Sequence, residues 1–147
     1  MNIRPLSNSQ RDIDSLTFLM NQWDDLPSPL TGKYIMEKVD LLRNSGSAEI
    51  LICVDDTDTA RGYICLTEII FLGMDPFVEV QSILVDSKAR RFGIGALLMK
   101  AAETWAAGKG IGMVCLSSQI QRTGAHEFYK KLGYTVYKQS LFFSKKF

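Results

Sequence analysis

The sequence is poor in the residues that build metal centres and disulfide frameworks. It has one histidine, His126, and three cysteines, Cys53, Cys65 and Cys115, which stand apart in apolar segments without C-x-x-C spacing. An odd number of separated cysteines is typical of reduced, buried thiols rather than of a secreted disulfide scaffold. We therefore expect a cytoplasmic protein without a metal site.

Charge excess and long apolar runs are also absent. The 17 basic and 16 acidic side chains leave a net charge of +1, which argues against a general nucleic-acid binder or a polybasic membrane binder. There is no apolar run of the roughly 18 residues that a membrane span needs, and no signal-peptide pattern. The length of 147 residues suits one domain. We expect a single domain over residues 1–147, with no nucleic-acid or membrane partner.

Residue periodicity divides the chain into strands and helices. Short apolar runs predict strands, and apolar stripes at helical spacing predict helices. The expected strands cover residues 1–5, 49–54, 61–71, 77–85, 113–117, 134–138 and 140–145, and the expected helices cover 9–23, 31–43, 94–108 and 123–132. Strands joined by hairpins come first, and strands alternating with helices follow. This order predicts an α+β fold.

A glycine turn between a strand and a helix is the first feature that indicates chemistry. Its sequence is Arg90-Arg91-Phe92-Gly93-Ile94-Gly95. Glycine lets the backbone approach a ligand, and the unpaired N–H groups at the positive end of a helix favour an anion such as pyrophosphate. Arg90 and Arg91 add positive charge beside it. The alternative is a basic loop that only joins strand to helix.

Two other phosphate motifs fail on spacing. The P-loop string G-x-x-x-x-G-K-[ST] is absent. A dinucleotide fingerprint needs a third glycine where Leu98 stands, in a turn near the start of the chain. The turn therefore indicates an anion site without naming the ligand.

The glycine turn and a second motif further along the chain together resemble the GNAT superfamily of acetyl-CoA-dependent N-acetyltransferases. The first, Gln or Arg-x-x-Gly-x-Gly or Ala, matches Arg90, Gly93 and Gly95. The second, an alanine followed by x-x-Phe-Tyr and a glycine-aromatic pair, matches Ala125, Phe128, Tyr129, Gly133 and Tyr134. The resemblance covers essentially the whole chain. It implies a mixed, mainly antiparallel central sheet flanked by about four helices, with a splayed strand pair forming the CoA cleft.

A narrower resemblance rests on residues 122–129, Arg-Thr-Gly-Ala-His-Glu-Phe-Tyr. This segment is similar to a subgroup that acetylates small amines, such as aminoalkylphosphonate N-acetyltransferase. Many relatives have asparagine at the position of Arg122. The resemblance therefore does not extend to the hydrogen bond that this asparagine gives to the pantetheine arm.

The resemblance implies how acetyl-CoA would bind as a co-substrate, between the strands at 77–85 and 113–117. The pantetheine amides would pair with backbone groups like an added strand, and the pyrophosphate would lie on N–H groups of the glycine turn. The predicted cofactor residues are Ile83, Leu84, Val85, Arg90, Arg91, Phe92, Gly93, Ile94, Gly95 and Ala96.

Two side chains are candidates for acid–base chemistry. Tyr129 is the expected acid toward the departing thiolate, because a hydroxyl with a reference pKa near 10 stays protonated at neutral pH; a core position is the alternative. Glu79 is the expected base, directly or through water, and a solvated or ion-paired strand glutamate is the alternative. Alternation places Glu79 on one side of its strand with Phe77, Gln81 and Ile83, which predicts a polar cleft.

Several other charged residues have competing explanations. His126 suits helix packing better than catalysis. Asp24 and Asp25 either attract a cationic amine or are solvated turn residues. Lys130 and Lys131 either reach the CoA 3′-phosphate or lie on a solvated helix face.

Together these residues predict direct transfer of an acetyl group from acetyl-CoA to a primary amine, with a small molecule as the expected acceptor. A ternary complex without a covalent intermediate is expected, since no cysteine lies in either motif. The alternatives are a non-catalytic CoA-binding sensor or regulatory module, acetylation of a protein amine, and transfer of a longer acyl chain. The C-terminal strands, with Phe142, Phe143 and Phe147, either pair across a homodimer or belong to the core.

Overall fold

A five-stranded sheet organises Met1–Leu116, the first of two units in a structure that is a computed structural model of residues 1–147. Its strands lie in chain order: β1 Asn2–Pro5, β2 Ala48–Val54, β3 Ala60–Phe71, β4 Met74–Val85 and β5 Val114–Leu116. Neighbouring strands are antiparallel except β4 and β5, which are parallel. With four α-helices in the chain, this mixed sheet confirms the predicted fold class.

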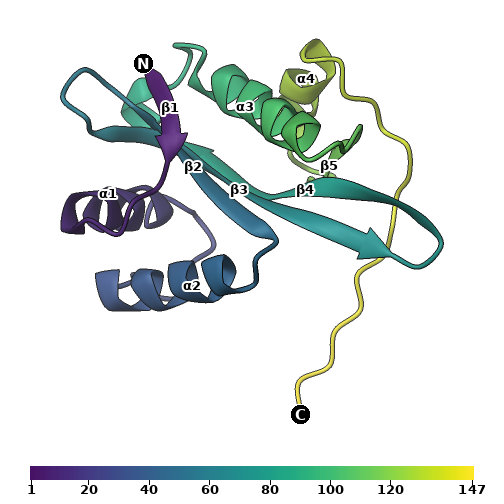
Figure 1. The fold of residues 1–147 in the computed structure, drawn as a ribbon, viewed down its shortest axis with the longest axis horizontal. Helices are drawn as coiled ribbons and strands as arrows, with labels where there is room; N and C mark the ends of the chain where they lie inside the picture. The colour runs from purple at the N-terminus through teal and green to yellow at the C-terminus, as the bar shows by residue number, and fades with distance from the viewer. The chain divides into compact units, whose positions relative to one another are not determined.

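Helices cover both faces of the sheet (Figure 1). Helices α1, Gln10–Met20, and α2, Gly32–Asn44, lie on one face, and α3, Ile94–Gly108, lies on the other. The side chains of Ser9 and Thr31 cap the N-termini of α1 and α2 by accepting backbone N–H groups. Helix α1 ends at Met20, three residues before the predicted boundary.

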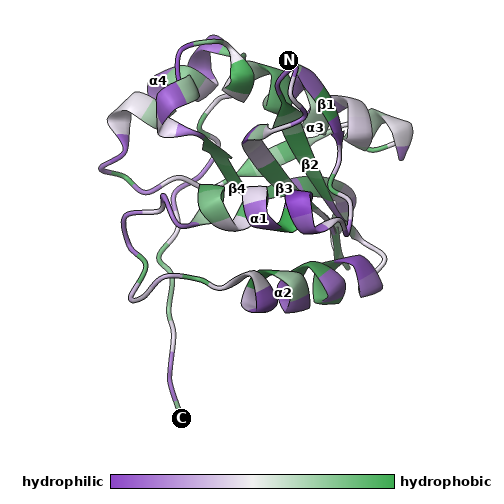
Figure 2. Ribbon diagram, turned by 90° about the vertical axis from the view of Figure 1, so that its left-hand side faces the viewer, coloured by the Kyte–Doolittle hydropathy of each residue, from purple (hydrophilic) through white to green (hydrophobic).

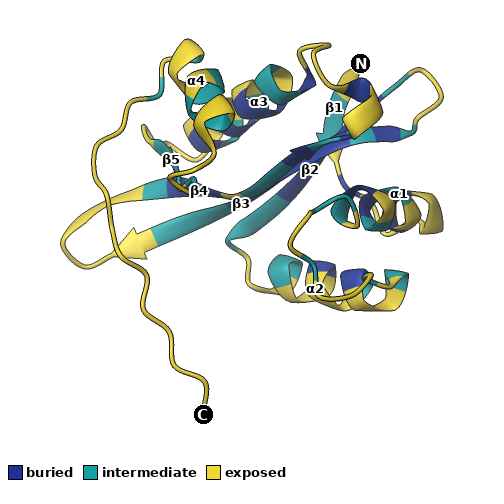
Figure 3. Ribbon diagram, turned by 180° about the vertical axis from the view of Figure 1, so that it is seen from behind, coloured by how far each residue is buried: buried dark blue, intermediate teal, exposed yellow.

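The main core fills the space between the sheet and helices α1 and α2. Figure 2 shows hydrophobic residues along the strands, and Figure 3 shows burial concentrated in the same strands and the inward sides of the helices. Fully buried side chains of this core include Leu19, Ile35, Val39, Ile52 and Tyr63. Because each element hides one apolar face, burial holds the helices to the sheet.

Strand β4 begins at Met74, earlier than the predicted residue 77, and contains two irregularities in its pairing with β3. The first leaves Asp75 and Pro76 opposite Ile70, and a bulge is a position at which proline is tolerated in a strand. The second leaves Gln81 as an extra residue. The predicted break at 73–76 is therefore confined to the turn around Gly73.

The second unit, Ser117–Phe147, contains helix α4, Thr123–Lys131. Gly133, with φ +91°, ends this helix. Its N–H donates to the Lys130 carbonyl, and the Tyr134 N–H donates to the Tyr129 carbonyl, each at 3.0 Å. These two bonds form a Schellman motif.

Residues 134–147 form neither helix nor strand, so the predicted strands at 134–138 and 140–145 are wrong. Apolar composition favours a strand, but a strand forms only where another strand supplies hydrogen bonds. The side chains of Phe142, Phe143 and Phe147 are exposed, so they do not belong to a core. No helix of the structure has the length and apolar content needed to cross a membrane.

Candidate functional site

The glycine turn lies between β4 and α3. It begins with the short 3₁₀ helix η1, Ser87–Ala89, and ends at Gly93, the N-cap of α3. Arg91 and Gly93 both have left-handed backbone conformations, with φ +69° and +78°. Glycine adopts this conformation at little cost, whereas a non-glycine residue such as Arg91 pays a steric penalty that is often found at functional sites.

The first turn of α3 leaves backbone donors available. Gly93 has no side chain to cap the helix, and the first intrahelical bond runs from the Leu97 N–H to the Gly93 carbonyl at 3.0 Å. The N–H groups of Ile94, Gly95 and Ala96 precede that bond and have no acceptor within the helix. They form the donor row that the sequence predicts for an anion.

The other predicted turn residues surround this donor row. Phe92 is exposed, as are Arg90 and Arg91. The Arg90 Nε lies 3.5 Å from the Val85 carbonyl, which brings this guanidinium back toward the end of β4. Two cations therefore accompany the free N–H groups.

Strand β5 covers only part of β4. The parallel pairing joins Val78–Val80 to Val114–Leu116 and extends no further. Beyond Val80, strand β4 continues to Val85 with β3 on one side and no strand on the other. An unpaired edge of this kind accepts an extended ligand through backbone hydrogen bonds.

Backbone alternation decides which groups reach the open edge. The Asp86 N–H donates to the Arg61 carbonyl at 2.8 Å and so points toward β3. Alternate residues of an antiparallel strand point the same way, so Leu84 also faces β3, while Ile83 and Val85 face the open edge. Of the three predicted pantetheine contacts, Ile83 and Val85 direct their backbone groups to the edge that has no strand partner, where the Val85 carbonyl has the Arg90 side chain 3.5 Å away.

The bulge at Gln81 changes the face of the sheet on which Ile83 lies. Residues opposite each other in an antiparallel pair share a face of the sheet. Glu79 opposes Thr67, whereas Ile83 opposes Ile64, which points to the other face of β3. The prediction that Ile83 shares the side of Glu79 is therefore wrong, because the extra residue reverses the alternation.

A polar group lies on the face that carries Glu79. The Gln81 amide donates to the Thr67 hydroxyl. Nearby on this face, the Trp23 indole N–H donates to the Tyr63 hydroxyl at 3.1 Å. The Glu79 side chain is half-buried and makes no ion pair or hydrogen bond. A carboxylate in this setting has its proton-accepting oxygens available.

Tyr129 lies in α4 of the second unit. Its ring makes edge contacts with Phe128 at 5.2 Å and with Tyr134 at 6.4 Å between centroids. Burial raises the pKa of the Tyr129 hydroxyl, against a smaller opposing effect of Arg122. The hydroxyl is therefore protonated at neutral pH, as an acid requires. Glu79 belongs to the first unit and Tyr129 to the second.

The remaining candidates occupy ordinary positions. One His126 ring nitrogen lies 3.0 Å from the Gln119 carbonyl, which agrees with a structural role. Asp24 and Asp25 are exposed in the loop between α1 and α2, and Lys130 pairs with Glu127 at 3.4 Å. The described residues contain no group of three or more His, Cys, Asp or Glu side chains placed to hold a metal.

The two buried thiols, Cys53 and Cys65, are poor nucleophiles. Burial, with a smaller effect of the Glu49 charge, raises the pKa of the Cys65 thiol to about 11. Burial also raises the pKa of Cys53. A thiol with a raised pKa carries little thiolate at neutral pH.

Sequence reasoning missed a buried carboxylate at the end of β4. Asp86 accepts hydrogen bonds from Gln22 and Arg61, both at 3.3 Å. Its partners lie far away in the sequence, so no local pattern indicates the cluster. An aspartate directly before a glycine turn is the one available signal, and on its own it reads as an ordinary turn residue.

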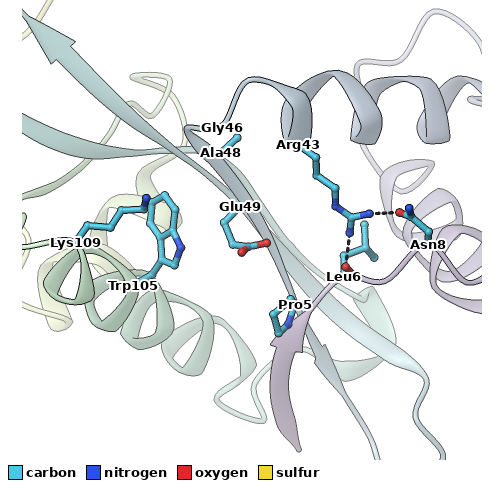
Figure 4. Close-up of a pocket in the computed structure, with 9 residues that line it drawn as sticks. All are labelled: Pro5, Leu6, Asn8, Arg43, Gly46, Ala48, Glu49, Trp105 and Lys109. Atoms are coloured by element: carbon cyan, nitrogen blue, oxygen red, sulfur yellow. Dashed lines mark hydrogen bonds between the residues drawn. The ribbon is translucent and has the colours of Figure 1, made fainter.

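A pocket of about 590 Å³ lies elsewhere, where the edge of β2 extends past the end of β1 (Figure 4). Its cations already have partners: Arg43 donates to Asn8 and to the Leu6 carbonyl, and the Lys109 ammonium lies 4.7 Å from the centre of the Trp105 ring. The lining residues are Pro5, Leu6, Asn8, Arg43, Gly46, Ala48, Glu49, Trp105 and Lys109. None of the predicted cofactor or catalytic residues is among them.

Known proteins match this chain in sequence. The model of the acetyltransferase (GNAT) family matches residues 13–134. The uncharacterized N-acetyltransferase YhdJ of Bacillus subtilis (strain 168) is 38% identical over 58 residues, which are 39% of this chain and 41% of that protein. The match thus spans about two fifths of the length of this curated relative.

Solved structures match the fold over nearly all of the chain. The apo aminoglycoside antibiotic 6′-N-acetyltransferase AAC(6′)-IG of Acinetobacter haemolyticus has a TM-score of 0.79 and 22% identity, covering 100% of this chain and 99% of that one. AAC(6′)-Iy, in complex with the bisubstrate analog CoA-S-monomethyl-acetylneamine, has a TM-score of 0.82 and 19% identity, covering 99% and 97%. A transcriptional regulator of Bacillus halodurans C-125 has a TM-score of 0.84 and 19% identity, covering 98% and 99%.

Proposed function

The chain belongs to the acetyltransferase (GNAT) family, and from this premise we propose that it transfers an acetyl group from acetyl-CoA to a primary amine of a small molecule. Membership of this family confirms the resemblance that the two motifs indicated. The narrower resemblance to aminoalkylphosphonate N-acetyltransferase stays a prediction. The observation that carries the proposal is the row of free N–H groups at Ile94, Gly95 and Ala96, beside an open edge of β4.

Acetyl-CoA is the proposed co-substrate, without a metal. Its pyrophosphate would accept hydrogen bonds from the first turn of α3, with Arg90 and Arg91 nearby. Its pantetheine amides would pair with Ile83 and Val85 at the open edge. The fold neighbour AAC(6′)-Iy is in complex with a bisubstrate analog that contains CoA, which supports this choice of donor.

The proposed reaction is a direct transfer in a ternary complex. Glu79, directly or through water, takes a proton from the acceptor ammonium, and the neutral nitrogen attacks the acetyl carbonyl carbon. The new C–N bond forms, the C–S bond breaks, and Tyr129 donates its hydroxyl proton to the departing thiolate. The second proton that the nitrogen loses as the amide forms passes through water to restore the Tyr129 hydroxyl. The raised pKa of Cys65, from burial, argues against an acyl-cysteine intermediate.

The acceptor, the cellular location and the oligomeric state are also proposals. A small amine is favoured because AAC(6′)-IG and AAC(6′)-Iy, named as aminoglycoside acetyltransferases, share this fold. The exposed pair Asp24 and Asp25 would attract its positive charge. Free cysteines support a cytoplasmic location. Exposed aromatic residues in the C-terminal segment support a homodimer.

Thiol release from acetyl-CoA tests the proposal. The purified protein is supplied with acetyl-CoA and a panel of small primary amines, aminoglycosides, aminoalkylphosphonates and lysine peptides, while free CoA thiol is measured. We expect turnover with at least one small amine. Turnover with peptides alone would assign a protein acceptor. Tight CoA binding without thiol release for any amine would instead assign a regulatory module, as the fold match to a transcriptional regulator allows.

A further inference from the structure

Three consecutive residues after α1 connect the α1–α2 loop to its surroundings. The Leu30 N–H donates to the Asn21 side-chain oxygen at 2.7 Å, which closes the loop on itself. The Trp23 indole N–H donates to the Tyr63 hydroxyl on β3. Gln22, between them, reaches the segment that leads from β4 into the glycine turn, where acetyl-CoA would bind.

The Gln22 amide bridges two consecutive residues at the junction between β4 and that turn. Its Nε2 donates to Asp86 Oδ1 at 3.3 Å, and its Oε1 accepts the Ser87 N–H at 2.9 Å. Asp86 caps η1, and Ser87 is the first residue of η1. One side chain from the α1–α2 loop therefore holds the point at which β4 becomes the turn.

Asp86 fixes this point, because its buried side chain accepts several hydrogen bonds. Its side chain is 2% exposed and accepts hydrogen bonds from the Lys88 N–H at 3.2 Å and from Arg61 at 3.3 Å. Burial acts to raise the pKa of Asp86, but the hydrogen bonds from Lys88, Gln22 and Arg61 outweigh it and hold the pKa below its usual value. Asp86 is thus a charged carboxylate with several donors.

We propose that Gln22 is a positioning residue for acetyl-CoA, which it places by fixing the start of the pyrophosphate-binding turn. The inference rests on the proposed function. Only four residues separate η1 from the first turn of α3, and Arg91 among them has a left-handed backbone. A shift at Ser87 therefore moves the N–H row that faces the pyrophosphate, and small displacements of such donors weaken binding.

Calorimetric affinity for acetyl-CoA tests this role. Gln22→Met keeps the size of the side chain and removes both hydrogen bonds, so we expect the dissociation constant to rise about fivefold, the factor of one ordinary hydrogen bond. KM for acetyl-CoA should rise in step, with kcat unchanged. Gln10→Met is the matched control, because Gln10 donates to Asp14 at 2.7 Å and both side chains lie on the exposed side of α1.

A second variant should make the affinity for acetyl-CoA depend on pH. Gln22→Glu keeps an acceptor for Ser87 but sets a carboxylate against Asp86. Two adjacent carboxylates share a proton, so the variant should bind weakly at about pH 8 and approach wild type at about pH 5.5. Gln22→Met, measured at the same pH values, should show no such recovery relative to wild type.

The outcomes separate this inference from the proposed function. A wild-type protein that does not bind acetyl-CoA would overturn the proposed function itself. A wild-type protein that binds, with Gln22→Met or Gln22→Glu binding equally well at about pH 8, would overturn the positioning role, even where the melting temperature falls. Weaker binding with an unchanged Gln10→Met control would support it.

Discussion

At the scale of single residues, two glutamates on neighbouring strands differ in their surroundings. Glu79 opposes Thr67, whereas Glu68 opposes Val78 and so lies on the other face of the sheet. Glu68 forms an ion pair with Lys109 at 3.6 Å, while Glu79 has no partner. The sequence alone presents both as strand glutamates, so the register distinguishes them.

This difference predicts the effect of removing each carboxylate. If Glu79 is the base, Glu79→Gln should lower kcat about 10²–10⁴-fold, because an amide cannot accept the proton. Glu68→Gln should leave kcat close to wild type. Thiol release under saturating acetyl-CoA, with an acceptor found in the amine panel, measures both. Equal losses in the two variants would contradict a base at position 79.

At the scale of elements, the contact between α3 and β3 is possible because Gly62 has no side chain. A Cβ at Gly62 would lie 3.0 Å from both the Leu84 carbonyl oxygen and Ile94 Cγ2. The carbonyl belongs to the strand backbone and cannot move aside without disturbing β4. This contact seats the start of α3, and with it the N–H row, against the sheet.

We therefore expect Gly62→Ala to lower the free energy of unfolding by about 1–3 kcal/mol, as overpacking in a core does. Gly108→Ala is the matched control, because a Cβ there meets no atom within 4 Å. In a helix this change should be neutral or stabilising by up to about 1 kcal/mol. Urea unfolding measures both. A neutral Gly62→Ala would show that α3 does not press on β3.

The start of α1 depends on a buried carboxylate. Asp12 accepts hydrogen bonds from Arg4 at 2.7 and 2.9 Å and from the Ser7 N–H at 2.7 Å. The Arg4 bond is the main cause that holds the pKa of Asp12 well below its usual value. A lowered pKa stabilises the fold above the unfolded pKa of about 4, and this share is lost as pH falls through the folded pKa.

Asp12→Asn should therefore lower the free energy of unfolding by about 1–3 kcal/mol at about pH 7. The gap from wild type should narrow below about pH 3, as the wild-type carboxylate becomes protonated. Urea unfolding across this range measures the gap. Asp14→Asn is the control, since Asp14 is exposed and hydrogen-bonded only to Gln10. A gap that stays constant with pH would contradict the ionised pair.

At the scale of the whole molecule, the C-terminal segment should mediate self-association. It has no strand partner, and the Phe142 and Phe143 side chains are 86% and 90% exposed. Unpaired backbone beside exposed aromatic groups favours pairing with another chain. Light scattering after size exclusion should show a dimer for wild type and a monomer for the double variant Phe142→Ser, Phe143→Ser.

Phe18→Ser provides the control for that experiment, because Phe18 is an exposed aromatic residue on α1. This variant should remain dimeric. A wild-type protein that is monomeric over the whole concentration range would contradict the expected role of the segment.

Most elements could be predicted because their signals are local. Apolar periodicity identified β1 through β5 and the four helices, and the glycine turn marked where α3 begins. Two predictions failed where the cause is not local. A bulge at Gln81 depends on how β4 pairs with β3, and the strands expected at 134–145 lack a partner.

For the site, the sequence by itself determined the position of the glycine turn and the family resemblance, because a helix start with Gly93 and Gly95 and the motif around Tyr129 need only a few neighbouring residues. Only the tertiary structure decided that Ile83 and Val85 face an open edge, that Glu79 is unpaired, and that Gln22 meets Asp86. These facts depend on strand register and on contacts between distant segments. Burial of the whole core sets such contacts, and no local pattern of residues encodes them.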